Sequence, residues 1–101
     1  MEKKTPKFYE LPVSSRLEQL AREAGLPLED LLPLAGAPAL TPETADYMIE
    51  NALGVFGLPL GVARNFLING REVLVPMVIE EPSVVAGASY MAKLVRSGGG
   101  F

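Results

Sequence analysis

The chain has 101 residues, of which 49% are hydrophobic and 21% are charged, and its formal net charge is −3. This composition excludes a disordered chain, and an acidic pI of about 4.9 gives no electrostatic signal for nucleic-acid binding. Cysteine and histidine are both absent, which excludes disulfides, the common zinc ligand sets and Ser-His or Cys-His pairs within these residues. Because no apolar run reaches the roughly 18 residues of a membrane span and no signal peptide is recognisable, a cytoplasmic protein is predicted.

The chain begins with a predicted extended arm and a first helix. Residues 1–13 contain two prolines and read as the arm. Ser15 and Glu18 fit a capping box that would open a helix with leucines and alanines on one face. Gly25 is predicted to end that helix, because glycine readily adopts the left-handed conformation found at helix C-termini.

Two further helical segments are predicted before the middle of the chain. Residues 28–32, which lie between two prolines, predict one short helical turn. Thr41 followed by Pro42 is typical of a helix start, and Gly54 is the expected end of that helix. The first half is therefore predicted to be small helices joined by Pro/Gly loops.

A β-hairpin is predicted next. Residues 60–68 read as a strand, and Asn69-Gly70 is the strongest short-range hairpin signal because both residue types tolerate positive φ. The return strand shows the alternation expected of a half-buried strand, with apolar side chains at Val73, Val75 and Met77.

The last predicted element is a helix over residues 82–96 whose apolar side chains cover more than one face, which predicts burial on several sides. A lone hairpin is marginally stable and cannot cover such a helix. The fold class is therefore predicted to be α+β: small helices, a hairpin and a long buried helix within a larger substrate-binding domain. Residues 1–57 are expected to be mainly helical, and residues 58–101 to form the hairpin and central helix.

Two adjacent carboxylates, Glu80 and Glu81, stand between the return strand and this helix, followed by Pro82 and Ser83. Proline suits the first position of a helix, so the side chains of Glu81 and Ser83 are expected at its positive end. A carboxylate held there can act as an acid or base. The alternative is structural, since acidic residues favour first turns by complementing the helix dipole.

Several long motifs occur in one order: residues 50–63 (ENALGVFGLPLGVA), 65–71 (NFLINGR), 75–77 (VPM) and 80–86 (EEPSVVA). Together they closely resemble the N-terminal part of 3-hydroxy-3-methylglutaryl-CoA reductase, specifically the bacterial class II form. The similarity runs from about Ser15 to Phe101. The resemblance implies an enzyme that interconverts hydroxymethylglutaryl-CoA with mevalonate and CoA by two hydride transfers involving NADH or NADPH.

The resemblance also implies roles for individual residues. Glu81 matches the catalytic glutamate, which works beside a lysine, whereas Glu80 is expected to be structural because adjacent side chains point to different sides. Ser83 matches the serine that binds the hydroxymethylglutaryl carboxylate, with first-turn capping as its alternative role.

Glu50 and Asn51 resemble the Glu-Asn pair of a family motif at the dimer interface near the substrate pocket, with Ala52-Leu53 in place of Val-Ile. The alternative for Asn51 is capping the end of its helix. A homodimer or higher homo-oligomer, without nucleic acid or membrane, is the expected assembly.

Other parts of the family's machinery are expected to lie outside residues 1–101. These are a catalytic lysine, an aspartate, a flap histidine and the cofactor-binding domain, so the chain alone is predicted to be inactive. Two alternatives stay open. One is a non-catalytic dimerisation module, and the other is a CoA-binding module using Arg64 and Arg71, although hairpin arginines are usually just solvated.

Overall fold

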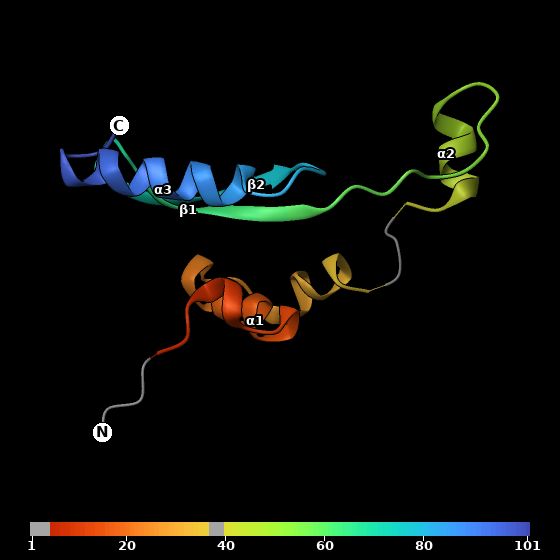
Figure 1. The fold of residues 1–101 in the computed structure, drawn as a ribbon. Coiled ribbons are helices and arrows are strands. Elements are labelled where there is room, and N and C mark those ends of the chain that lie inside the picture. Colours follow the sequence, from red (N-terminus) through yellow and green to blue (C-terminus); the bar gives the residue numbers. More distant parts are fainter. Residues whose placement is uncertain (1–4, 37–39) are drawn as a thin grey trace. The chain divides into compact units, whose positions relative to one another are not determined.

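The computed structural model describes residues 5–36 and 40–101. Its contacts divide the chain into two units, Met1–Val55 and Phe56–Phe101. The described elements are α-helical and β, as predicted, and Figure 1 shows the labelled helices and strands. In chain order they are η1 (Phe8–Glu10), α1 (Val13–Ala24), η2 (Leu28–Asp30), η3 (Leu32–Leu34), α2 (Pro42–Met48), β1 (Leu60–Ile68), β2 (Arg71–Val78) and α3 (Val84–Ser97).

The start of α1 differs from its prediction. The helix follows Pro12, whose backbone is extended, and its first hydrogen bond runs from the Arg16 N–H to the Pro12 carbonyl at 3.0 Å. Ser15 and Glu18 lie inside the helix, so the predicted capping box is wrong. A capping serine needs a non-helical backbone, which position 15 does not have. The predicted arm is described only from Thr5 onward, and it contains the 3-10 turn η1.

The end of α1 confirms its prediction. Gly25 has a φ of 67°, and the Leu26 N–H donates to the Ala21 carbonyl at 3.0 Å, the long bond of a Schellman motif. Beyond it, the single helical turn predicted for residues 28–32 is instead two consecutive 3-10 turns, η2 and η3.

Helix α2 begins as predicted and ends earlier. The Thr41 hydroxyl oxygen accepts the Thr44 N–H at 3.2 Å, so the predicted cap is present. The helix ends at Met48 because Ile49 is extended, with φ −138° and ψ 156°. The predicted continuation to Gly54 is therefore wrong.

The hairpin agrees with its prediction. β1 and β2 pair antiparallel from Leu60 opposite Val78 to Ile68 opposite Arg71. The connecting Asn69 and Gly70 have φ of 51° and 76°, the positive values that a type I′ turn requires. This short turn returns β2 directly beside β1.

Helix α3 runs along the hairpin in Figure 1 and contacts β1. Small side chains form the centre of this interface: Ala63 on β1 is 0% exposed and Ala92 on α3 is 1% exposed. An exposed ion pair between Arg96 and Glu72 joins α3 to β2. The described residues bury only part of α3 and leave three large apolar side chains exposed, Tyr90, Met91 and Leu94.

The glycines after α3 turn the chain back onto β1. The Phe101 N–H donates to the Leu67 carbonyl at 2.7 Å, and the Asn69 N–H donates to the Phe101 carbonyl at 2.8 Å. The Phe101 ring stacks on Phe66 with centroids 5.6 Å apart. An added Cβ at Gly100, where φ is 86°, would lie 2.6 Å from the Leu67 carbonyl oxygen, so only glycine permits this approach.

Candidate functional site

The predicted catalytic glutamate lies in the connection between β2 and α3. The Ile79 N–H donates to the Pro59 carbonyl at 3.2 Å next to the strand pairing, and the chain then bends through Glu80 and Glu81. Helix α3 begins only at Val84. Pro82 was predicted to occupy the first helical position, and this is wrong because it precedes the residue that caps the helix.

Ser83 is that capping residue, and its backbone conformation explains the late start of α3. Its φ of 75° and ψ of −8° are left-handed, which is unfavourable for a residue with a Cβ. Its carbonyl accepts the Gly87 N–H at 2.8 Å, whereas its side chain makes no capping hydrogen bond. The hydroxyl predicted to bind substrate is therefore not used to cap the helix. Backbone strain of this kind clusters at ligand sites.

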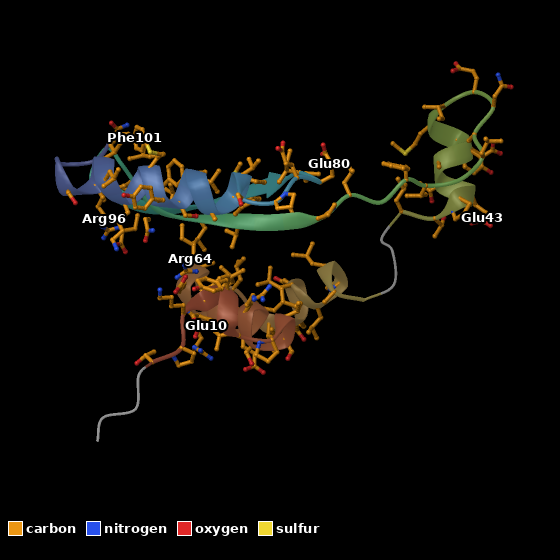
Figure 2. All side chains as sticks on the ribbon, viewed as in Figure 1. Glu10, Glu43, Arg64, Glu80, Arg96 and Phe101 are labelled. Carbon is orange, nitrogen blue, oxygen red and sulfur yellow. The ribbon has the colours of Figure 1, made fainter. Side chains whose placement is uncertain are left out.

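Glu80 and Glu81 are both exposed, and in the described part of the chain neither carboxylate has a hydrogen-bonding or ionic partner. Figure 2 labels Glu80 at one end of the hairpin–helix unit, with Arg96 and Phe101 at the other end. Two unpaired carboxylates at the mouth of α3 are thus available to a ligand or to another part of a larger protein.

A polar contact that was not predicted from the sequence joins β1 to α3. The strand pairing is irregular between Ala63 and Phe66, and Asn65 there has a φ of 72°. The Arg64 N–H donates to the Ser89 hydroxyl at 2.9 Å, and Asn65 Nδ2 donates to the Ser89 carbonyl at 3.1 Å. The one available signal was the asparagine, because this residue type tolerates a left-handed backbone.

Glu50 and Asn51, the other predicted site residues, belong to the first unit. They form a turn after α2, where Asn51 has a φ of 56° and both residues are exposed. The C-terminal cap of α2 is Ile49, so the alternative role predicted for Asn51 as the cap is wrong. Each pair of predicted site residues therefore lies in a turn that follows a regular element.

The described residues offer little to other kinds of ligand. Within residues 5–36 and 40–101, no group of acidic side chains is arranged to hold a metal ion. In the same ranges, no helix is long and apolar enough to cross a membrane. The turn from β2 into α3 carries two carboxylates, which would repel the pyrophosphate of a dinucleotide, so this turn does not fit a nicotinamide cofactor.

Comparison with known proteins decides the family. The model of the hydroxymethylglutaryl-coenzyme A reductase family matches residues 12–101. The chain belongs to this family. It is 50% identical over 101 residues to a 3-hydroxy-3-methylglutaryl-coenzyme A reductase of Archaeoglobus fulgidus, covering all of this chain and 23% of that protein. It is 40% identical over 50 residues to a probable reductase of Borreliella burgdorferi, covering 50% of this chain and 12% of that protein.

A solved structure gives the same result. The class II reductase of Streptococcus pneumoniae, bound to NADPH in open conformations, matches with a TM-score of 0.81 and 40% identity, over 92% of this chain and 25% of that one. The predicted resemblance and the α+β fold class are thereby confirmed. The chain spans about a quarter of the length of these reductases.

Proposed function

We propose that this chain is a segment of a reductase that interconverts hydroxymethylglutaryl-CoA with mevalonate and CoA through two NADH- or NADPH-dependent hydride transfers. Family membership supports the reaction class. The observation that carries the proposal is the turn at residues 80–83, where a strained serine follows two exposed carboxylates without partners among the described residues. The 101-residue chain alone is proposed to be inactive, because it spans 23% of the archaeal relative.

In the proposed mechanism Glu81 is the acid. Reduction of a thioester carbonyl places negative charge on the carbonyl oxygen, and loss of CoA places negative charge on its sulfur. A protonated Glu81 carboxyl neutralises these charges by giving its proton to the oxygen or the sulfur as the charge develops. Its position beyond the last strand residue leaves the carboxyl free to approach the substrate.

Ser83 is proposed to hold the other end of the substrate. Its hydroxyl would donate a hydrogen bond to the carboxylate of the hydroxymethylglutaryl group, and a bond to a charged acceptor is stronger than a neutral one. Glu50 and Asn51 are proposed to contribute polar contacts to the same substrate at the interface of a homodimer. Their exposure in a turn is consistent with such a contact.

The nicotinamide cofactor is proposed to bind mainly to parts of the reductase outside this chain. In the described residues, the strand-to-helix turn that would be its usual anchor carries carboxylates instead of the glycines of a dinucleotide-binding turn. The contribution of this chain is therefore substrate binding and proton transfer.

The experiment that tests this function compares Glu81→Gln with Glu80→Gln in a full-length reductase that carries this segment. Glutamine keeps the size of the side chain and removes its acidic proton. We expect kcat of Glu81→Gln to fall roughly 10²–10⁴-fold, the usual contribution of general acid–base catalysis, while KM changes much less. Steady-state rates at saturating substrate measure this effect.

Glu80→Gln is the matched control, because it removes an equally exposed carboxylate from the neighbouring position. We expect it to keep most of the wild-type kcat. Equal losses in both variants, or a loss explained by a lower melting temperature, would mean that the pair is a structural helix start and that Glu81 is not the acid.

A further inference from the structure

We propose that Ser89 is a positioning residue, which fixes the Glu81–Ser83 turn relative to β1 through its hydrogen bond to the irregular part of that strand. This inference rests on the proposed function, because it concerns the placement of the proposed acid. Ser89 lies in the middle of α3, six residues after the capping Ser83. Its hydroxyl is engaged by the Arg64 N–H and the Val85 carbonyl, so it is assigned no contact with a ligand.

The strand irregularity creates the group that Ser89 satisfies. The pairing of β1 with β2 is regular up to Ala63 and resumes at Phe66, so the two residues between them are left out of the ladder. A backbone N–H released in this way needs another acceptor when it is removed from water. For the Arg64 N–H this acceptor is the partly buried Ser89 hydroxyl, at 2.9 Å.

Ser89 contacts β1 through two groups, its side-chain hydroxyl and its backbone carbonyl. Its hydroxyl accepts from Arg64 and donates to the Val85 carbonyl at 3.0 Å, one turn earlier on α3. Its own carbonyl accepts from Asn65 Nδ2 at 3.1 Å. Both irregular strand residues are thus tied to one position of the helix, which sets how far α3 can slide along β1.

Apolar packing alone fixes the position of α3 along β1, which we call its register, less firmly than these hydrogen bonds do. The neighbouring contacts are between small groups: an added Cβ at Gly61 would lie 3.4 Å from Val85 Cγ2, and Ala63 and Ala92 are buried. Smooth surfaces of this kind permit close approach, but they resist sliding less than side chains that interlock. The hydrogen bonds at Ser89 are directional and therefore specify one register.

A fixed register matters at the start of α3. Gly87, two residues before Ser89, donates its N–H to the Ser83 carbonyl at 2.8 Å, so the capping turn moves with the helix. If α3 shifts along β1, Glu81 and Ser83 shift relative to the strand and to whatever is held against it. Displacement of a catalytic group by about 1 Å can cost roughly 10²-fold in rate.

The test uses the full-length reductase with Ser89→Ala, and Ser97→Ala is its matched control. The Ser97 hydroxyl donates to the Lys93 carbonyl on the same helix, as Ser89 does to Val85, but it makes no bond to a strand. We expect Ser89→Ala to lose roughly 10-fold to 100-fold in kcat with little change in KM. Ser97→Ala is expected to keep its kcat.

A second measurement separates positioning from general stability. Hydrogen exchange is followed by mass spectrometry on peptides that contain Arg64 and Gly87, whose amides make the two bonds described above. We expect faster exchange at both in Ser89→Ala, and recovery of kcat and protection in Ser89→Thr, which keeps the hydroxyl. Asn65→Gly preserves the left-handed backbone and removes the side-chain bond to the Ser89 carbonyl. We expect it to lower kcat relative to wild type and to speed exchange at Gly87. If Ser89→Ala does not fold, an unchanged kcat and unchanged exchange in Asn65→Gly overturn the inference.

The outcomes distinguish this inference from the proposed function. An unchanged kcat in Ser89→Ala while Glu81→Gln is impaired overturns the positioning role alone. Equal losses in Ser89→Ala and Ser97→Ala, or unchanged exchange at Arg64 and Gly87, also overturn it. An unchanged kcat in Glu81→Gln contradicts the proposed acid, and the exchange result still decides whether Ser89 holds the turn.

Discussion

Ser83 illustrates how a single backbone conformation shapes the candidate site. Its left-handed φ of 75° prevents α3 from beginning at Pro82, and it leaves the hydroxyl without a capping bond. No capping hydrogen bond of the side chain compensates this conformation, which costs a residue with a Cβ about 1–2 kcal/mol of free energy. Such a cost at a position where glycine would fit better is consistent with a functional use of the hydroxyl.

This interpretation predicts a difference between Ser83→Gly and Ser83→Ala in the full-length reductase. Both variants lose the hydroxyl, so we expect KM for the substrate to rise roughly 10-fold to 100-fold in each, as for a lost hydrogen bond to a charged group. The glycine variant relieves the backbone and should be about 1 kcal/mol more stable than the alanine variant. Kinetics and chemical unfolding measure the two effects. An unchanged KM in both variants would exclude Ser83 as the residue that binds the substrate carboxylate. A glycine variant less stable than the alanine variant would contradict the inference that the Ser83 backbone is strained.

At the scale of elements, the glycines of the hairpin turn and of α3 differ: Gly70 has the positive φ that favours glycine, and Gly87 has helical φ. Gly70 has a φ of 76° in the turn between β1 and β2. Gly87 lies inside α3, and an added Cβ there would meet nothing within 4 Å apart from its chain neighbours and the helix's own backbone. Close approach to a neighbour is found instead at Gly61 and Gly100.

Substitution by alanine should therefore have opposite effects at these two positions of the 101-residue chain. Gly70→Ala forces a Cβ into a left-handed turn, and we expect it to lower the free energy of unfolding by about 1 kcal/mol or more. Gly87→Ala should raise it by about 1 kcal/mol, because alanine favours a helix interior. Thermal unfolding followed by circular dichroism measures both. A destabilised Gly87→Ala variant would show that another surface packs against that glycine.

At the scale of the whole molecule, much apolar surface remains exposed. Large apolar side chains that are exposed follow one another along the sequence on both sides of the boundary between the two units: Tyr47, Met48, Ile49, Leu53, Val55, Phe56, Leu58 and Leu60. Leu53 and Phe56 are the extreme cases near the unit boundary, with exposures of 102% and 87%. Exposed apolar side chains that follow one another in this way usually mark an interaction surface.

We therefore expect the chain to form a dimer or higher oligomer, with residues 50–63 in or near the contact. Phe56→Asp should weaken the association, because it places a charge where an apolar side chain would be buried. Leu34→Asp, at an exposed leucine outside this segment, is the control and should leave it unchanged. Sedimentation equilibrium measures the association constants. A wild-type chain that stays monomeric and soluble at high concentration would count against this prediction.

Several features were predictable from the sequence because their causes are local. The Asn69-Gly70 turn, the Thr41 cap and the Gly25 helix end each depend on the φ preferences or side-chain hydrogen bonding of one or two residues. The family resemblance was equally accessible, since it rests on the order of the motifs alone. The capping box at Ser15 was wrong because Pro12 offered a competing helix start.

Tertiary structure decided what depends on contacts between distant residues. The return of Phe101 to β1 and the bond from Arg64 to Ser89 join positions that lie far apart in sequence, and no local preference reports them. The late start of α3 was also visible only in the structure: the Glu81-Pro82-Ser83 pattern permits a helix from Pro82, and the left-handed backbone of Ser83 excludes it. Residue types therefore determined which groups are available for chemistry. Their placement was decided by how α3 packs on β1, because a hydrogen bond satisfied across that interface sets a register that neither element specifies alone.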